Sequence, residues 1–169
     1  MVKKASLHPA VHPSSFKPFD KDAIKEIPAK SSGKVLKDPT MQKFGEFMSS
    51  DDFLHILHTQ NVNVYAGKTV HSNLNKDLCA AAAKNGIKCG LVIVKYNNLK
   101  TARTFNAMKV KGEGLVFLDI ENDGAYDENT FTGKVQRTTQ YAMFKFPKNP
   151  HYVARSGNKR NIASITIKW

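Results

Sequence analysis

The first half of the folded region is marked by apolar residues that recur at helical spacing. Apolar side chains at every third or fourth position over residues 41–48 predict a helix, and Thr40 before them is a typical capping residue. A second, short helix is predicted over residues 53–57, with Asp51 or Asp52 as its cap. The folded region is therefore expected to begin with helices.

Beyond Ser72 the pattern changes from helical to strand-like. Ser72 precedes a third helix, which the Asn85-Gly86 pair is expected to end with a left-handed turn. The strands predicted after it are short apolar segments between asparagine and glycine residues, namely residues 91–94, 105–110 and 115–120, the loosely alternating residues 129–146 and the alternating tail from Ile165 to Trp169. Helices first and strands after predict an α+β fold with helices packed on a mostly antiparallel sheet.

Prolines concentrate before this folded region. Five of the seven prolines lie in residues 1–39, where they exclude a continuous helix and favour extended backbone. We therefore predict an extended arm over residues 1–39 and a domain over residues 40–169. The arm is expected either to be a disordered tail or to order along a partner. The binding residues predicted in the arm are Phe16, Lys17, Phe19 and Lys21.

The excess of positive charge lies on the two flanks of the chain. The formal net charge is +12, and residues 1–40 contribute eight lysines against four acidic side chains. Residues 41–128 are neutral, whereas residues 129–169 carry eight basic side chains and no acidic one. This distribution favours contact with a polyanion or an acidic partner surface over a merely solubilising role.

The carboxy-terminal flank also mixes cations with aromatic rings. Tyr141, Phe144 and Phe146 lie among basic residues, as in proteins that contact phosphates and stack on bases, although the same rings fit the core of a sheet. The binding residues predicted in this flank are Lys148, Arg155, Lys159 and Arg160. The partner expected first is a larger protein assembly or an acidic protein surface, and the second is a nucleic acid.

Several functional classes lack their sequence signals. No apolar segment is long enough to span a bilayer, so no membrane partner is expected. Cys79 and Cys89, without CxxC spacing, favour a reducing compartment, and we expect a cytoplasmic protein. Residues from Asp119 to Asp127 have the spacing of a calcium loop, but Thr130 stands where a bidentate glutamate is needed. We therefore expect a hydrated acidic turn, and neither a metal nor a cofactor.

The chain from Asp38 to Glu121 resembles one known family in the order of its short motifs. The segments that carry the resemblance are Thr69-Val70-His71-Ser72 before the alanine-rich helix, Gly86-Ile87-Lys88-Cys89, Arg103-Thr104-Phe105-Asn106-Ala107 and Leu115-Val116-Phe117-Leu118-Asp119. In this order they resemble the transglutaminase-like domains, which are similar to papain-type cysteine peptidases. The resemblance covers roughly half of the chain and implies a transglutaminase-like core behind the arm.

The resemblance also implies that the family's catalytic residues are replaced. His71 stands at the position of the cysteine, Arg103 at that of the histidine and Asp119 at that of the aspartate. Acyl transfer needs a nucleophile and a base within hydrogen-bond reach, and arginine stays protonated at neutral pH. We therefore expect no transglutaminase or peptidase activity, and an ion pair between Arg103 and Asp119 on neighbouring strands.

Three functional hypotheses follow, in order of preference. The first is a non-catalytic, basic accessory or structural subunit of a larger assembly, docked through its arm and its carboxy-terminal flank. The second is a nucleic-acid-binding protein that uses the same flanks, on structured RNA in particular. The third is a hydrolase or acyltransferase with an unrecognised nucleophile, for which Cys79 and Cys89 are the candidates, although both fit a protein core.

Overall fold

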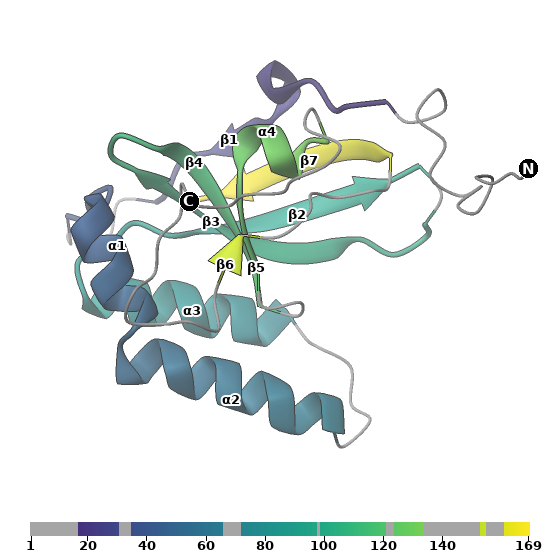
Figure 1. Cartoon of the computed structure of the whole chain (residues 1–169). Coiled ribbons are helices and arrows are strands. Elements are labelled where there is room, and N and C mark those ends of the chain that lie inside the picture. The colour runs from purple at the N-terminus through teal and green to yellow at the C-terminus, as the bar shows by residue number, and fades with distance from the viewer. Residues whose placement is uncertain are drawn as a thin grey trace, which may run out of the picture.

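A seven-stranded sheet with three helices on one face forms the described part of the chain (Figure 1). The computed structural model describes residues 17–30, 35–65, 72–97, 99–120, 124–133, 153–154 and 161–169. The helices are α1 (Met41–Met48), α2 (Asp51–Tyr65), α3 (Ser72–Lys84) and the single turn α4 (Glu128–Phe131), together with a 3-10 turn over Lys21–Ala23. The strands are β1 (Lys25–Ile27), β2 (Gly90–Tyr96), β3 (Arg103–Val110), β4 (Gly114–Asp119), β5 (Gly124–Asp127), β6 (Val153–Ala154) and β7 (Ile162–Lys168).

The sheet is mostly antiparallel, as the sequence predicts. Its strand order is β1-β7-β2-β3-β4-β5-β6. The inner pairs from β7 to β5 are antiparallel, whereas the outer pairs β1–β7 and β5–β6 are parallel. The α+β fold class is therefore confirmed, with one short parallel strand added at each edge.

The predicted start of α1 and the predicted end of α3 are confirmed in detail. The Thr40 side chain accepts a hydrogen bond from the Lys43 backbone N–H at 3.1 Å, which satisfies one free donor at the start of α1. Gly86 takes a φ of 74°, the left-handed conformation that ends α3. Ser50 caps α2 in place of Asp51 or Asp52, because its hydroxyl accepts from the Phe53 N–H at 3.3 Å. The predicted cap of α2 was therefore wrong by one or two residues.

The α2 helix is also longer than the predicted residues 53–57. It continues through a polar stretch to Tyr65. Its first two turns bury Phe53, Ile56 and Leu57 under α1 and α3, and once a helix is anchored each further residue adds one hydrogen bond. The apolar period therefore predicted where α2 packs and not where it ends.

The predicted strands between residues 91 and 120 are confirmed, and so is the alternating tail, which forms β7. The loosely alternating stretch from residue 129 was expected to be a strand, and this is wrong at its start, where α4 forms. The Phe131 ring stacks on Phe117 with centroids 4.0 Å apart and meets Phe105 edge-on at 5.0 Å. A single helical turn places this ring on the sheet, and residues 134–146 lie outside the described part.

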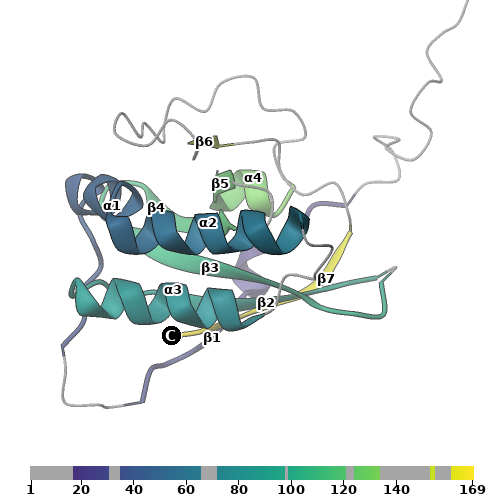
Figure 2. The ribbon, with the colours of Figure 1, turned by 90° about the horizontal axis from the view of Figure 1, so that it is seen from below.

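The sheet has an apolar cluster on each face. Met108 and Val110 of β3 belong to the cluster under α1, α2 and α3, whereas Phe105 and Ala107 of the same strand belong to the other cluster. This alternation follows from the period of two along a strand. The second face is covered by α4 and by residues of the predicted arm, and Figure 2 shows the three large helices together on the first face.

Residues 17–30 belong to the domain, which corrects the boundary predicted at residue 40 for this segment. β1 pairs in parallel with β7, with Glu26 opposite Ile167. Phe19 and Ile24 are half-buried and pack against the second apolar cluster. Phe19 therefore contributes to this protein's own core and is not an exposed anchor for a partner.

Among the helices of the described residues, none is long and apolar enough to cross a membrane.

Candidate functional site

Arg103 and Asp119 form the predicted ion pair. The Arg103 Nη2 atom lies 3.9 Å from the Asp119 Oδ1 atom, and their strands β3 and β4 are antiparallel neighbours. The Asp119 side chain is only 4% exposed, whereas that of Arg103 is 30% exposed. The guanidinium also lies over the Phe105 ring, 5.1 Å from its centroid. The pair therefore compensates a buried carboxylate at the end of the sheet where β3 begins.

This pair lies on the face of the sheet away from α3. Arg103 shares its face with Phe105, and Asp119 shares its face with Phe117, both of the second apolar cluster. The helix α3 packs on the opposite face. A catalytic base must lie within hydrogen-bond reach of its nucleophile, which the resemblance would place at the start of this helix. His71, the residue at that position, lies outside the described part.

The face that α3 covers carries a buried polar cluster instead. The Asn75 Nδ2 group of α3 donates to Asn106 Oδ1 of β3 at 2.7 Å, and the Asn106 Nδ2 group donates back to the Asn75 carbonyl at 2.9 Å. Thr104 donates its hydroxyl to Asn75 Oδ1 at 2.9 Å. Both asparagine side chains are buried, with residues 2% and 0% exposed, so this reciprocal bonding offsets the cost of removing them from water.

Both cysteines border this cluster. The Cys79 Sγ atom of α3 lies 3.6 Å from the Cys89 Sγ atom just before β2. The hydrogen bond with Cys89, together with the Asn106 amide, lowers the pKa of the Cys79 thiol, whereas burial raises the pKa of the Cys89 thiol well above its usual value. The sequence predicted two core thiols. It gave no sign that they meet, because the contact depends on how α3 sits on the sheet.

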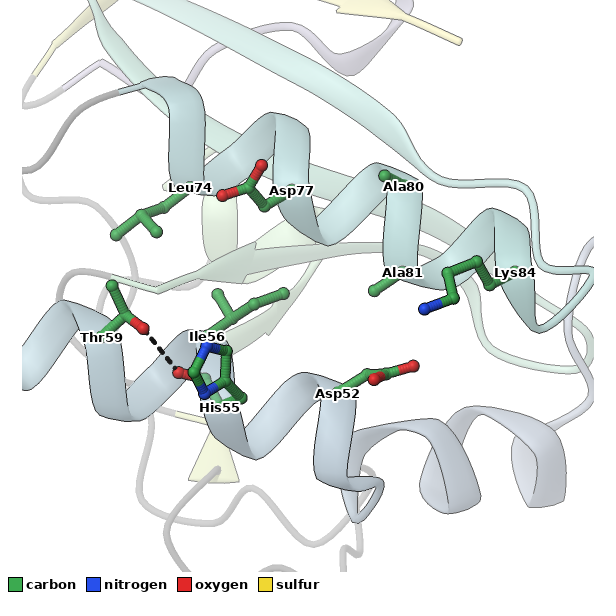
Figure 3. Close-up of a pocket in the computed structure, with 9 residues that line it drawn as sticks. All are labelled: Asp52, His55, Ile56, Thr59, Leu74, Asp77, Ala80, Ala81 and Lys84. Carbon is green, nitrogen blue, oxygen red and sulfur yellow. Dashed lines mark hydrogen bonds between the residues drawn. The ribbon is translucent and has the colours of Figure 1, made fainter.

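A groove of about 410 Å³ lies between α2 and α3, on their side away from the sheet (Figure 3). Asp52 and His55 line it from α2, and Asp77, Ala80 and Lys84 line it from α3. Two carboxylates, an imidazole and an ammonium group give it no dominant charge. Across the described residues, no three His, Cys, Asp or Glu side chains are grouped as a metal ion requires.

The acidic turn belongs to a hairpin and not to a helix-flanked calcium loop. Asp119 ends β4 opposite Gly124, and Asp127 ends β5 opposite Val116. The Asp119 carboxylate faces the Arg103 guanidinium, which occupies the place a cation would take. Residues 121–123 lie outside the described part.

The two basic flanks of the chain meet at one end of the sheet. The Lys17 backbone N–H donates to Asn161 Oδ1 at 3.1 Å, and the Phe19 N–H donates to the Thr132 carbonyl at 2.8 Å. The Asn97 N–H donates to the Asn161 carbonyl at 3.1 Å, so the end of β2 joins the same group. We call these residues, Lys17, Asn97, Thr132 and Asn161, the basic end. At the right of Figure 1 the start of β7 and the incoming amino-terminal segment lie side by side.

The basic end is where the most basic segments of the chain are attached. Residues 1–16 lead into Lys17, and residues 134–160 lie between Gly133 and Asn161. These two segments carry nine lysine and arginine side chains and no acidic one. The two segments thus carry charge equal to three quarters of the net +12, and the second also reaches the β5 edge of the sheet, where its residues Val153–Ala154 form β6.

The predicted binding residues are divided between described and undescribed parts of the chain. Lys17 is exposed at the basic end, and the Lys21 Nζ atom lies 3.6 Å from the Glu128 Oε1 atom. The structure thus assigns Lys21 an internal ion pair. The binding residues that lie outside the described part are Phe16, Lys148, Arg155, Lys159 and Arg160.

Comparisons with protein-family models, with curated proteins and with solved structures found no match for this chain. The resemblance to transglutaminase-like domains therefore stays a prediction from the sequence motifs.

Proposed function

We propose that the protein is a non-catalytic binding protein that holds a nucleic acid, single-stranded RNA in particular, through the segments attached to its basic end. One observation carries the proposal. Residues 1–16 and 134–160 together carry nine cations and no acid. These two segments are far apart in the sequence, but they join the fold at one place. A local concentration of positive charge attracts a polyanion from solution and weakens with added salt.

A nucleic acid is favoured over an acidic protein surface for two reasons. The segment of residues 134–160 places Tyr141, Phe144, Phe146 and Tyr152 among its cations, and stacking on bases needs such rings. The sequence also predicted Phe19 as a binding residue of the arm, but Phe19 is half-buried and packs against this protein's second apolar cluster. The hypothesis of an accessory subunit docked through that arm is therefore the weaker one.

The absence of catalysis is proposed from the chemistry of Arg103. A guanidinium stands where the resembled family has its histidine base, it contacts the Asp119 carboxylate, and both groups lie on the face away from α3. Arginine keeps its proton at neutral pH and cannot accept one from a nucleophile. The ion pair supports a stabilising and non-catalytic role for these two residues, whereas its position on the face away from α3 differs from the arrangement that a transglutaminase-like core would need.

A pair of double variants tests the proposal. Lys159 and Arg160 changed to alanine should weaken binding to a labelled single-stranded RNA by roughly 20-fold at about 0.1 M salt, because each lost phosphate contact costs about fivefold there. The control is Lys43→Ala with Lys76→Ala, which removes the same charge from exposed sites on α1 and α3. Its affinity should stay within about twofold of the parent. Equal losses in both variants would show general electrostatic attraction, and no binding by the parent would refute the proposal.

A further inference from the structure

The chain's two cysteines face each other beneath α3. Their sulfur atoms lie 3.6 Å apart, although ten positions separate them in the sequence. Cys79 comes from the middle of α3, and Cys89 comes from the segment that leads into β2. Both are free thiols in this structure. A disulfide bond would bring these sulfurs from 3.6 Å to about 2.05 Å apart.

The Asn106 side chain fixes the chemistry of this pair. Its Nδ2 group lies 3.3 Å from the Cys79 Sγ atom and 3.7 Å from the Cys89 Sγ atom. An amide N–H₂ donates hydrogen bonds, so it stabilises a thiolate and repels a metal cation from the space between the sulfurs. The same group is held by the Asn75 carbonyl at 2.9 Å and the Gly90 carbonyl at 3.2 Å. The site is therefore built for thiol chemistry and not for a metal ion.

The two sulfurs differ in access and in acidity. Cys79 is half-buried, whereas Cys89 is buried. The hydrogen bond with Cys89, and next the Asn106 amide, lowers the pKa of Cys79, while burial and the neighbouring Cys79 raise the pKa of Cys89. Since the thiolate is the reactive form, Cys79 is the sulfur that meets an external oxidant first, and Cys89 is placed to react with it second.

We propose that Cys79 and Cys89 form a redox-active dithiol that closes to an intramolecular disulfide on reaction with a peroxide. In the first step the Cys79 thiolate attacks one oxygen of the peroxide and the O–O bond breaks. With hydrogen peroxide, the products are a Cys79 sulfenic acid and hydroxide as the leaving group. In the second step the Cys89 sulfur attacks the Cys79 sulfur, the S–O bond breaks and water leaves. Overall, two thiols are oxidised to one disulfide, and one hydrogen peroxide is reduced to two waters.

The surrounding structure accommodates the closed form. The disulfide would link α3 to the residue before β2. The segment between them is already fixed to the end of α3, because the Ile87 N–H donates to the Ala82 carbonyl at 2.9 Å. Asn106 would keep its hydrogen bonds to the Asn75 and Gly90 carbonyls. Closure thus adds a covalent link without leaving a buried polar group unpaired.

The test is oxidation of the folded full chain with one equivalent of hydrogen peroxide, at low protein concentration, followed by denaturation, thiol counting and mass measurement. The expected product has no free thiols, is two hydrogen atoms lighter than the reduced chain and is monomeric. The urea-unfolded chain, treated in the same way, is expected to form the disulfide at least about tenfold more slowly, because its two sulfurs are not held close together. Thiols that persist in the folded chain while the unfolded chain oxidises would overturn the proposal, and so would disulfide-linked dimers.

Single variants test the order of the two sulfurs. Cys89→Ser should leave a Cys79 sulfenic acid that a dimedone probe traps. Cys79→Ser should slow the reaction of the folded chain with peroxide about tenfold or more, because the remaining thiol is buried. Equal reaction rates for the parent and Cys79→Ser would contradict the assignment of Cys79 as the attacking sulfur.

Discussion

The buried pair Asn75 and Asn106 shows how one polar residue can fix the packing of a helix on a sheet. Asn106 lies in a strand of otherwise largely apolar character, and its side chain makes a reciprocal pair of hydrogen bonds with Asn75 of α3. Such a pair has good geometry in one position of the helix only. A slip of α3 along the sheet would leave both amides buried and unpaired, which costs several kcal/mol.

We expect Asn106→Ala to lower the free energy of unfolding by about 2–4 kcal/mol. It removes the acceptor of the Asn75 amide and leaves that donor buried without a partner. Thr104→Val is the matched comparison, because it removes a single hydrogen bond to Asn75 and should cost about 1 kcal/mol. Urea unfolding of the two variants measures the difference. Equal costs would show that the reciprocal pair contributes nothing beyond a single hydrogen bond.

The Glu26 carboxylate makes a pH-dependent contribution to stability. The Lys109 ammonium, with its Nζ atom at 2.9 Å, and the Trp169 indole lower the pKa of Glu26. A lowered pKa in the folded state stabilises the protein above the ordinary glutamate pKa of about 4.3, and this stability is lost as the pH falls through the folded value. Because both side chains are 42% exposed, the contribution should not exceed about 1 kcal/mol.

Glu26→Gln should therefore lower the melting temperature slightly at pH 7, and this difference should shrink as the pH falls through the lowered pKa of Glu26 and the parent carboxylate becomes neutral. Glu113→Gln is the control, because Glu113 is exposed in the turn between β3 and β4. Thermal unfolding over this pH range is the measurement. A penalty for Glu26→Gln that is the same throughout the range would mean that packing, and not charge, is responsible.

At the scale of elements, the amino-terminal strand β1 is the largest departure from the sequence pattern. Its residues Lys25–Ile27 show no apolar alternation and are all exposed, so no local signal marks them as a strand. Their hydrogen-bonded partner β7 lies at the other end of the chain, and the Trp169 N–H adds a bond to the Ile27 carbonyl at 3.0 Å. The pairing depends on contacts that only the folded sheet creates.

Two truncations separate the roles of the arm. From the sequence alone, removal of the whole arm should leave the stability unchanged. With β1, Phe19 and Ile24 in the fold, removal of residues 1–30 should instead cost about 2–4 kcal/mol, from lost apolar burial and edge hydrogen bonds. Removal of residues 1–16 should leave the melting temperature within a degree or two and weaken RNA binding only. Equal melting temperatures for the two truncations would contradict the role of β1.

Sequence patterns predicted those elements whose own apolar residues mark them. The helix α3 and the strands β2 and β7 have a buried face with regular spacing, and β3 and β4 are largely apolar segments bounded by turn residues, so their approximate positions follow from the sequence. The end of α2, the α4 turn and β1 depend on single anchors or on partners far away in the sequence, such as the Phe131 ring on Phe117. Periodicity carries no information about such contacts.

For the same reason the sequence predicted one contact of the candidate sites and missed others. The Arg103–Asp119 pair follows from two motifs on adjacent strands, and it is confirmed. Its orientation away from α3, and the meeting of Cys79 with Cys89, depend on which face each side chain takes and on the position of the helix. An asparagine inside the apolar segment of residues 105–110 was the one signal in the sequence that a buried polar cluster lies there.

At the scale of the whole molecule, most of the net positive charge belongs to segments other than the neutral middle of the chain. Helices α1 to α4 and strands β2 to β5 lie in residues 40–131, whose middle stretch 41–128 is neutral, while residues 1–16 and 134–160, of which only β6 is described, hold nine cations and no acid. The attachment of both segments is fixed by the Lys17 N–H, which donates to the Asn161 side chain, and by the Phe19 N–H, which donates to the Thr132 carbonyl. The described fold thus brings together the points at which these two basic segments join it, Lys17 beside Asn161 and Phe19 beside Thr132.

The salt dependence of RNA affinity tests the central claim most directly. If Lys148, Arg155, Lys159 and Arg160 each neutralise a phosphate, the logarithm of the association constant should fall linearly with the logarithm of salt concentration, with a slope of about −3 on single-stranded RNA. Changing Lys159 and Arg160 to alanine should flatten this slope to about −1.5. A slope shallower than about −1, or one that the double variant leaves unchanged, would contradict a phosphate contact at the basic end and would favour an acidic protein partner.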